Sequence, residues 1–257
     1  MKQPQYSLEQ MKERFASQPI GTKILYFPSV TSTMDAASEE LKRKTDHGTV
    51  ILADEQTLGQ GRLSRRWASP YGGVYISIVL FPKKEHVPIL TRLAALSVAD
   101  TLMNVGNVEV DFKWPNDVLL NGKKIGGIIA RSGLGVHDEF WAIVGIGVNI
   151  NTNVSLYPEI SHIATSLKSE TGSELSLQVV VESLLKSFSA RYKEMENGSS
   201  LVADWKAKLV SLGKEVTVTH GAKMIKGVAA SVDDSGALIV QTECGAIVSI
   251  VSGDVSS

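Results

Sequence analysis

The chain has 257 residues and a net charge of −1, with 26 lysines and arginines against 27 acidic residues. Its 43% hydrophobic and 21% charged content is typical of a globular protein, which excludes disorder over most of the length and a global positive field for nucleic acid. The single cysteine, Cys244, excludes an intramolecular disulfide, and the longest apolar run, Val74 to Phe81, is far shorter than the ~20 residues of a membrane span.

The first part of the chain mixes predicted strands and helices. Apolar residues at helical spacing predict helices, and short apolar runs predict strands. In chain order these patterns predict a short amphipathic segment over 8–15, a strand over 23–27, a helix over 31–44, a strand over 49–56, a loop rich in glycine and arginine over 59–67, a strand over 74–81 and a helix over 90–102 that Gly106 ends.

The central part predicts an antiparallel arrangement. Strands are expected over 108–113, 118–120, 124–131 and 140–149, and Asn121-Gly122 supplies a tight hairpin turn. These strands lie too close together in sequence for helical crossovers, so the sheet is expected to be mixed and largely antiparallel. A long helix follows over 177–192, between Ser176 and Asn197, and a second helix over 201–209 ends at Gly213.

The character of the sequence changes after Gly213. Short runs of period two over 215–219, 224–232, 237–243 and 246–251 are separated by turn signals, which predicts a small β-barrel. We therefore expect an α+β fold in two domains. Residues 1–212 form a larger sheet packed with helices, and residues 213–257 form a barrel that depends on its neighbour for stability.

Two short segments concentrate positive charge. Residues 59–67 contain Arg62, Arg65 and Arg66 without an acidic residue, and residues 113–124 contain three lysines against Asp117 alone. A glycine-flanked loop with arginines suits a carboxylate or phosphate ligand, although a solvated basic loop explains the same pattern.

The segment Lys113 to Asp117 combines a cation, an aromatic ring, an amide and a carboxylate, which suits a nucleotide with Mg²⁺. The alternative is that Trp114 is a core residue and that Asn116 and Asp117 form an Asx-type turn. The five histidines show no metal-ligand spacing, so no tightly bound metal is expected.

Five segments in order carry a resemblance to a known family. They are Ser32 to Met34, Gln56 to Trp67, Lys113 to Asp117, Lys124 to Ile128 and Gly145 to Asn149. Together they closely resemble the biotin protein ligases, from about residue 24 to the C-terminus. The resemblance implies the class II synthetase-like catalytic fold of these ligases with a C-terminal SH3-like barrel. It also implies that Mg-ATP activates biotin to biotinyl-5′-AMP, which then passes biotin to a lysine of a biotin carboxyl carrier protein.

The resemblance also implies roles for individual residues. Lys124 and Arg62 are expected to be catalytic, and Asp117 is expected to hold Mg²⁺. The expected biotin-binding residues are Ser32, Thr33, Met34, Gln56, Gly59, Gln60, Gly61, Arg62, Lys124 and Gly127. The expected nucleotide-binding residues are Arg65, Trp67, Lys113, Asn116, Lys124 and Asn149. One departure is that the loop usually reads Gly-Arg-Gly-Arg, and Gln60 removes one cation, which bears on retention of the adenylate.

Other functions remain as alternatives at this stage. A lipoate-protein ligase shares the fold and the activation chemistry, but its glycine-rich segment differs. A biotin-responsive transcriptional regulator needs a basic reading head, and the net charge and the short segment before residue 23 argue against one and against a nucleic-acid partner. Met1 to Arg14 has no apolar signal segment, so we expect a cytoplasmic enzyme without a membrane partner. Whether the subunit forms a homodimer stays open.

Overall fold

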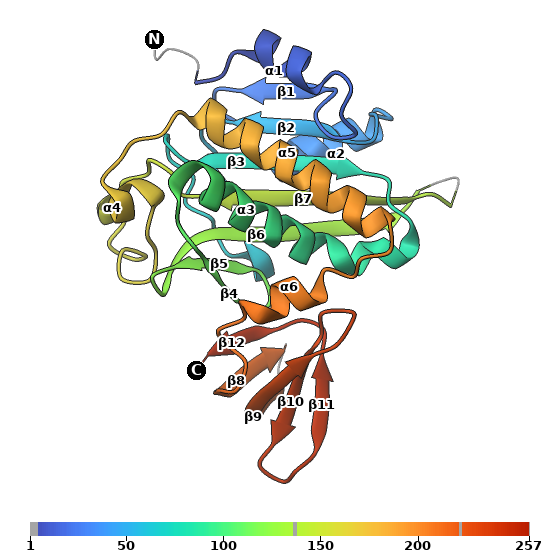
Figure 1. Ribbon diagram of the computed structural model, residues 1–257, viewed down its shortest axis with the longest axis vertical. Coiled ribbons are helices and arrows are strands. Elements are labelled where there is room, and N and C mark those ends of the chain that lie inside the picture. Colours follow the sequence, from blue (N-terminus) through green and yellow to red (C-terminus); the bar gives the residue numbers. More distant parts are fainter. Residues whose placement is uncertain (1–4, 136–137, 221–222, 257) are drawn as a thin grey trace.

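The computed structural model describes residues 5–135, 138–220 and 223–256, which build two β-sheets with helices around the larger one (Figure 1). The larger sheet has seven strands in the order β1-β2-β3-β7-β6-β5-β4. Only β1 and β2 pair in parallel, and the other neighbours are antiparallel. The second sheet has five antiparallel strands in the order β11-β10-β9-β8-β12. The predicted α+β class with a largely antiparallel main sheet and a small C-terminal β domain is therefore confirmed.

The elements follow the chain in a simple order. The strands of the main sheet are β1 (Ile24–Phe27), β2 (Thr49–Ala53), β3 (Val74–Leu80), β4 (Asp111–Lys113), β5 (Asp117–Leu120), β6 (Lys123–Leu134) and β7 (Phe140–Val148). The helices are α1 (Leu8–Phe15), α2 (Thr33–Lys42), α3 (Leu90–Gly106), α4 (Leu167–Thr171), α5 (Leu177–Glu196) and α6 (Val202–Ala207). The C-terminal strands are β8 (Glu215–His220), β9 (Lys223–Val232), β10 (Leu238–Thr242), β11 (Ile247–Ile250) and β12 (Asp254–Ser256).

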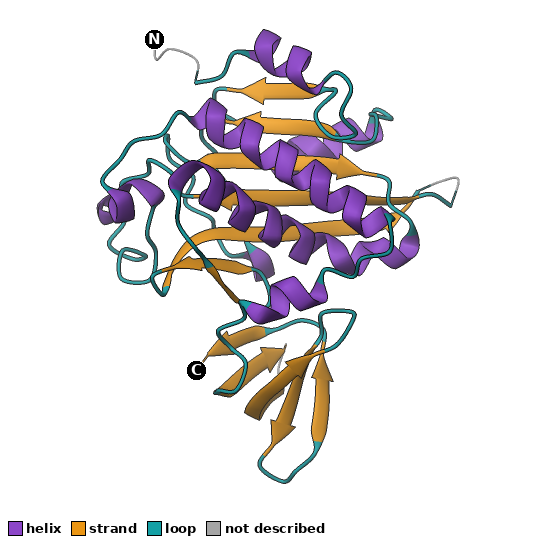
Figure 2. Cartoon of the chain, in the orientation of Figure 1, coloured by secondary structure: helices purple, strands orange, loops and turns teal. Residues whose placement is uncertain are grey.

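Helices cover both faces of the main sheet, which explains why β2, β3 and most of β7 are buried and largely apolar. The long helices α3 and α5 lie side by side across one face (Figure 2). On the other face, α2 buries Met34 and Ala37 against Ile51, Val79 and Ile143. Strands that are buried on both faces lose the alternation of polar and apolar residues and read as continuous apolar runs.

The helix boundaries differ from the predicted ones in physically simple ways. Helix α3 includes Gly106, and the left-handed residue that ends it is Asn107, with φ of 50°. Asparagine tolerates this conformation because its short polar side chain can bond to the local backbone. Two elements were not predicted: α4, which is only five residues long, and β12, which holds three residues at the C-terminus. Neither is long enough to show a periodicity.

The C-terminal sheet is anchored to the main domain by buried polar side chains. The indole Nε1 of Trp114 donates a hydrogen bond to the Gly236 carbonyl (3.0 Å), and the buried Arg92 guanidinium donates to the Asp234 carbonyl (2.7 Å). Trp114 is 2% exposed and is therefore a core residue. Across the described ranges, no helix has the length and apolar character needed to cross a membrane.

Candidate functional site

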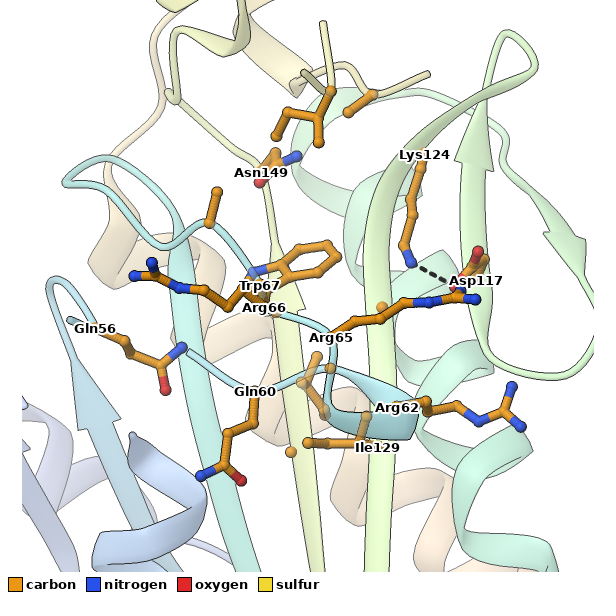
Figure 3. A pocket seen from close by; sticks show the side chains of 18 of the residues that line it. Gln56, Gln60, Arg62, Arg65, Arg66, Trp67, Asp117, Lys124, Ile129 and Asn149 are labelled. Atoms are coloured by element: carbon orange, nitrogen blue, oxygen red, sulfur yellow. Dashed lines mark ion pairs between the residues drawn. The ribbon is translucent and has the colours of Figure 1, made fainter. Parts of the chain in front are cut away.

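A cavity of about 260 Å³ opens where the glycine- and arginine-rich loop crosses β6 and β7 (Figure 3). Fourteen of the residues expected from the sequence line it: Ser32, Thr33, Met34, Gln56, Gln60, Gly61, Arg62, Arg65, Trp67, Asn116, Asp117, Lys124, Gly127 and Asn149. Gly59 and Lys113 do not line it. Gly59 is the first residue of the loop and packs against its last residue, since a Cβ atom on Gly59 would approach the Trp67 carbonyl to 2.5 Å. Lys113 is the last residue of β4.

One wall of the cavity is polar and rigid. The Thr33 backbone N–H donates to Gln56 Oε1 (2.8 Å), and the Gln56 amide donates to the Ser69 hydroxyl (2.8 Å). The buried Ser77 hydroxyl donates to Thr33 Oγ1 (2.8 Å), and Ser32 caps α2 by accepting from the Met34 N–H. Because each side chain is held by another, this wall presents hydroxyl and amide groups in fixed positions.

The floor of the cavity is a pair of glycines on adjacent strands. Gly127 and Gly147 are directly opposite each other, and the indole ring of Trp67 lies on them. A Cβ atom on Gly147 would come within 2.6 Å of Trp67 Nε1, and one on Gly127 within 3.1 Å of the same ring. Within the described ranges, the buried indole N–H of Trp67 has no hydrogen-bond partner. A buried donor without a partner is uncommon in a folded protein, and at a cavity it suits a ligand acceptor.

Lys124 places an ammonium group at the edge of this floor. Its Nζ lies 2.6 Å from Asp117 Oδ1 and 5.2 Å from the centre of the Trp67 ring. Its backbone is bonded on both sides, because its N–H donates to the Ile163 carbonyl (2.8 Å) and its carbonyl accepts from the Thr165 N–H (2.9 Å). The Lys124 side chain is 30% exposed, so a ligand in the cavity can reach a cation whose position is set by strand and ion pair.

Two of the three arginines of the loop, Arg62 and Arg65, reach the C-terminal domain. Arg62 Nη1 donates to Asn116 Oδ1 (3.2 Å) and to the Gly253 carbonyl (3.2 Å), and Arg65 forms an ion pair with Asp254. Burial lowers the pKa of Arg62, while the charges of Asp254 and Asp117 act in the opposite direction. The C-terminal strand thus contributes Asp254 to the lining of the cavity.

The charges around the cavity favour an anionic ligand. Among the described lining residues, four are cationic (Arg62, Arg65, Arg66 and Lys124) and two are anionic (Asp117 and Asp254). Mg²⁺ in nucleotide sites is held by one or two carboxylates, with phosphates and water supplying the remaining ligands. No cluster of three or more metal-ligating side chains occurs in the part of the chain that the structure describes. Of the two carboxylates in the lining, Asp117 is the one beside Lys124, and a single carboxylate suits a Mg²⁺ ion that arrives with a nucleotide.

Several lining residues could not be identified from sequence motifs. Ile129 on β6 extends the floor, and Tyr157, Ile160 and Ile163 come from the segment between β7 and α4. This segment has no recognisable spacing, and Asp254 lies 189 positions beyond Arg65. Asn149 is 5% exposed, and its amide donates to the Thr165 carbonyl (3.0 Å), so this predicted nucleotide-binding residue also fixes the loop at the cavity rim.

Comparisons with known proteins give a consistent picture. Residues 26–149 match the Biotin/lipoate A/B protein ligase family, and residues 211–256 match the Biotin protein ligase C terminal domain. The chain is 33% identical to the Bifunctional ligase/repressor BirA of Bacillus subtilis over 242 residues, 92% of this chain and 74% of that protein. It is 31% identical to the Biotin--[acetyl-CoA-carboxylase] ligase of Mycobacterium tuberculosis, over 81% of this chain and 78% of that protein.

The fold comparison agrees with the sequence comparison. The biotin protein ligase of Aquifex aeolicus, solved in complex with biotin and ATP, superposes with a TM-score of 0.78 at 34% identity, covering 91% of this chain and 97% of that one. Both domains of the present chain therefore have counterparts in the same group of proteins. The chain belongs to the biotin protein ligase family.

Proposed function

We propose that the protein joins biotin to a lysine of a biotin carboxyl carrier protein in two steps. In the first, a biotin carboxylate oxygen attacks the α-phosphorus of ATP, and pyrophosphate leaves. In the second, the lysine amine attacks the acyl carbon of biotinyl-5′-AMP, the bond from that carbon to AMP oxygen breaks, and the nitrogen loses a proton. Both reactants of the first step are anions, so the chain must offset their repulsion.

The position of Lys124 carries this proposal. Its ammonium group is held at the edge of the glycine floor, 2.6 Å from Asp117 and against Trp67. A fixed cation between a carboxylate and a phosphate stabilises the negative charge that both share in the transition state. Arg62, half-buried between Asn116 and Gly253, supplies a second set of donors near Asp117, the partner of Lys124.

The polar wall supports biotin over lipoate as the substrate. The ureido ring of biotin carries both N–H donors and a carbonyl acceptor, whereas the dithiolane ring of lipoate carries neither. Ser32, Thr33 and Gln56 present hydroxyl and amide groups that match a ureido ring. Beyond their contacts with one another, these groups keep hydrogen-bonding capacity, such as the second N–H of the Gln56 amide. A ureido ring can use this capacity, whereas an apolar ring would leave it unused at a cost of about 1–3 kcal/mol for each buried group.

Mg²⁺ fits this scheme as the ion that enters with ATP. Asp117 would hold it, and the ion would supply charge neutralisation at the phosphates. The relatives named for acetyl-CoA carboxylase suggest that the acceptor is the biotin-carrying part of a carboxylase. A substrate set of ATP, biotin and such a carrier is available in the cytoplasm.

Isotopic ATP–pyrophosphate exchange tests the proposal, with biotin and lipoate offered side by side. We expect exchange that requires biotin and Mg²⁺, and subsequent labelling of a carrier domain with its target lysine but not of the same domain with that lysine changed to arginine. Exchange that depends on lipoate and not on biotin would replace the proposed substrate.

A further inference from the structure

Three side chains from different elements meet beside the closed end of the cavity. The Gln60 amide nitrogen donates to Asp35 Oδ2 (2.7 Å), and Arg131 donates to the Gln60 amide oxygen. Arg131 also lies 3.5 Å from Asp35 Oδ1 in an ion pair. Asp35 is in the first turn of α2, Gln60 is in the glycine- and arginine-rich loop, and Arg131 is on β6. We call these three residues the clasp.

The clasp lies next to the cavity without belonging to its cationic end. Alternate residues of a strand share one face, so Gly127, Ile129 and Arg131 lie on the same face of β6. Arg131 therefore lies just beyond the floor, next to Ile129. Ile129 pairs with Gly145, where Met34 packs, and this contact closes the cavity. Figure 3 shows the Gln60 amide turned away from Lys124 and Asp117. Its two partners therefore occupy the polar groups of the Gln60 side chain.

Away from Gln60, the glycine- and arginine-rich loop is held by arginines that a ligand in the cavity would also contact. Arg62 and Arg65 contact Gly253 and Asp254, but both arginines also line the cavity, and an anionic ligand competes for them. Gln60 lines the cavity, but its two partners in the clasp, Arg131 and Asp35, do not, so an anionic ligand does not compete for them. The clasp can therefore hold the loop over the cavity both before and after a ligand binds.

We infer that Gln60 is a positioning residue, and that its clasp with Arg131 and Asp35 keeps the loop closed over bound biotinyl-5′-AMP and slows the release of this intermediate. Gln60 stands where the family usually has an arginine, and in this chain Arg131 on β6 supplies a positive charge at the same place. The inference rests on the proposed function, since it concerns the intermediate of that reaction. The clasp side chains are about half-exposed, at 47% for Arg131 and 49% for Asp35, so their contribution is that of a surface network.

The test measures the release of preformed biotinyl-5′-AMP and the single-turnover rate of its formation in the full chain. For Arg131→Ala we expect release about fivefold faster, the scale of a partly exposed ion pair. The rate of formation should change less than twofold, because Lys124 is untouched. Arg43→Ala is the matched control, since it removes an exposed arginine that pairs with Glu40 at the far end of α2. It should leave both rates unchanged.

Exchanging the residues at positions 60 and 131 tests whether release depends on the contacts of the clasp or only on the number of positive charges in the loop. Gln60→Arg alone places two guanidinium groups side by side and should speed release. The double variant Gln60→Arg with Arg131→Gln restores one amide, one guanidinium and Asp35, and should return release to within twofold of the wild type. Slower release from Gln60→Arg alone, or unchanged release from Arg131→Ala, would overturn the inference.

Hydrogen exchange in the ligand-free protein distinguishes this inference from the proposed function. Arg131→Ala should raise exchange at the amides of residues 59–67 and not elsewhere, whatever substrate the enzyme uses. If the wild-type protein forms no biotinyl-5′-AMP, the proposed function and the role in retention are both refuted. Amide hydrogen exchange over residues 59–67 would still show whether the clasp holds the loop. Unchanged exchange over these residues would refute the clasp alone.

Discussion

Lys124 and Gly127 are three positions apart on β6, yet they share the face of the sheet that forms the cavity floor. A Cβ atom on Gly127 would lie 3.4 Å from Lys124 Cε. Regular alternation places residues an odd number apart on opposite faces. The pairing with β5 explains the difference, because Val118 pairs with Gly126 and Leu119 with Lys124, which leaves Ile125 as an extra residue. This β-bulge turns Lys124 toward the cavity and Ile125 into the core.

Replacement of Lys124 should have the largest effect on the first step. Lys124→Ala is expected to reduce biotin-dependent pyrophosphate exchange by roughly 10²–10³-fold, the scale of losing one preorganised charge donor. Lys124→Arg should restore little, because a planar guanidinium cannot take the place of a compact ammonium group. Both variants should unfold at nearly the wild-type temperature, as measured by circular dichroism.

Lys123→Ala is the internal control for that experiment. Lys123 is exposed and adjacent to Lys124, so its side chain points away from the cavity floor. Replacement of Lys123 should change the rate of biotin-dependent pyrophosphate exchange less than twofold. Equal loss in Lys123→Ala and Lys124→Ala would show that the assignment of faces around the bulge is incorrect.

Arg62→Ala should weaken retention of biotinyl-5′-AMP more than it weakens the fold. Arg62 contacts Asn116 and Gly253 through one nitrogen at 3.2 Å, so few protein contacts depend on it in the empty cavity. A charge-assisted hydrogen bond to an anionic ligand is worth about 1.5–3 kcal/mol, or roughly tenfold to a hundredfold in affinity. Calorimetric titration with a non-hydrolysable analogue of the adenylate measures this change, and normal affinity would contradict the assigned role.

Gly147→Ala should damage ligand binding through Trp67. The added methyl group would come within 2.6 Å of the indole nitrogen, so the ring must leave the glycine floor. We expect at least tenfold weaker binding of biotinyl-5′-AMP, since the displaced ring loses its place beside Lys124 while the loop can move without unfolding the sheet. Thermal unfolding of the ligand-free protein should shift by only a few degrees, on the order of 1 kcal/mol for this chain length. Unaltered binding would mean that the floor does not position Trp67.

Asp254→Asn tests the contact between the two domains. The change removes one of the two acidic side chains in the cavity lining and releases Arg65. The Arg65 side chain is 66% exposed, so the lost ion pair should cost at most about 1 kcal/mol of stability. Affinity for the anionic adenylate should rise about threefold, because Arg65 no longer has a competing partner. Weaker binding in this variant would instead assign Asp254 a positive role in holding the ligand.

The fold was largely accessible from local patterns in the sequence. The Asn121-Gly122 turn has positive φ at both residues, 51° and 77°, as that dipeptide predicts. The apolar spacing of α3 and α5 also identified both long helices. The boundaries were less accessible, because α6 spans only Val202–Ala207 and the chain beyond it continues through turns that local periodicity does not distinguish from helix.

Identifying the site required both the sequence motifs and the folded structure. The resemblance of five short motifs, in order, to the biotin protein ligases was enough to group Lys124, Arg62, Trp67 and Asp117 in one site. It was not enough to show that Lys124 pairs with Asp117, or that Trp67 lies on Gly127 and Gly147. Those relationships depend on strand register, which side-chain type alone does not specify.

The sequence by itself determined the long helices, most strands of both sheets and the chemical content of the loop, because these follow from periodicity and composition over a few neighbouring residues. Tertiary structure alone decided three things: the bulge at Ile125 that aims Lys124, the arrival of Asp254 beside Arg65, and the meeting of Gln60 with Arg131 and Asp35. Each joins elements whose register or position is set by packing across the whole sheet. A contact between residues 71 or 189 positions apart leaves no periodic trace in the sequence, so only the folded chain reveals it.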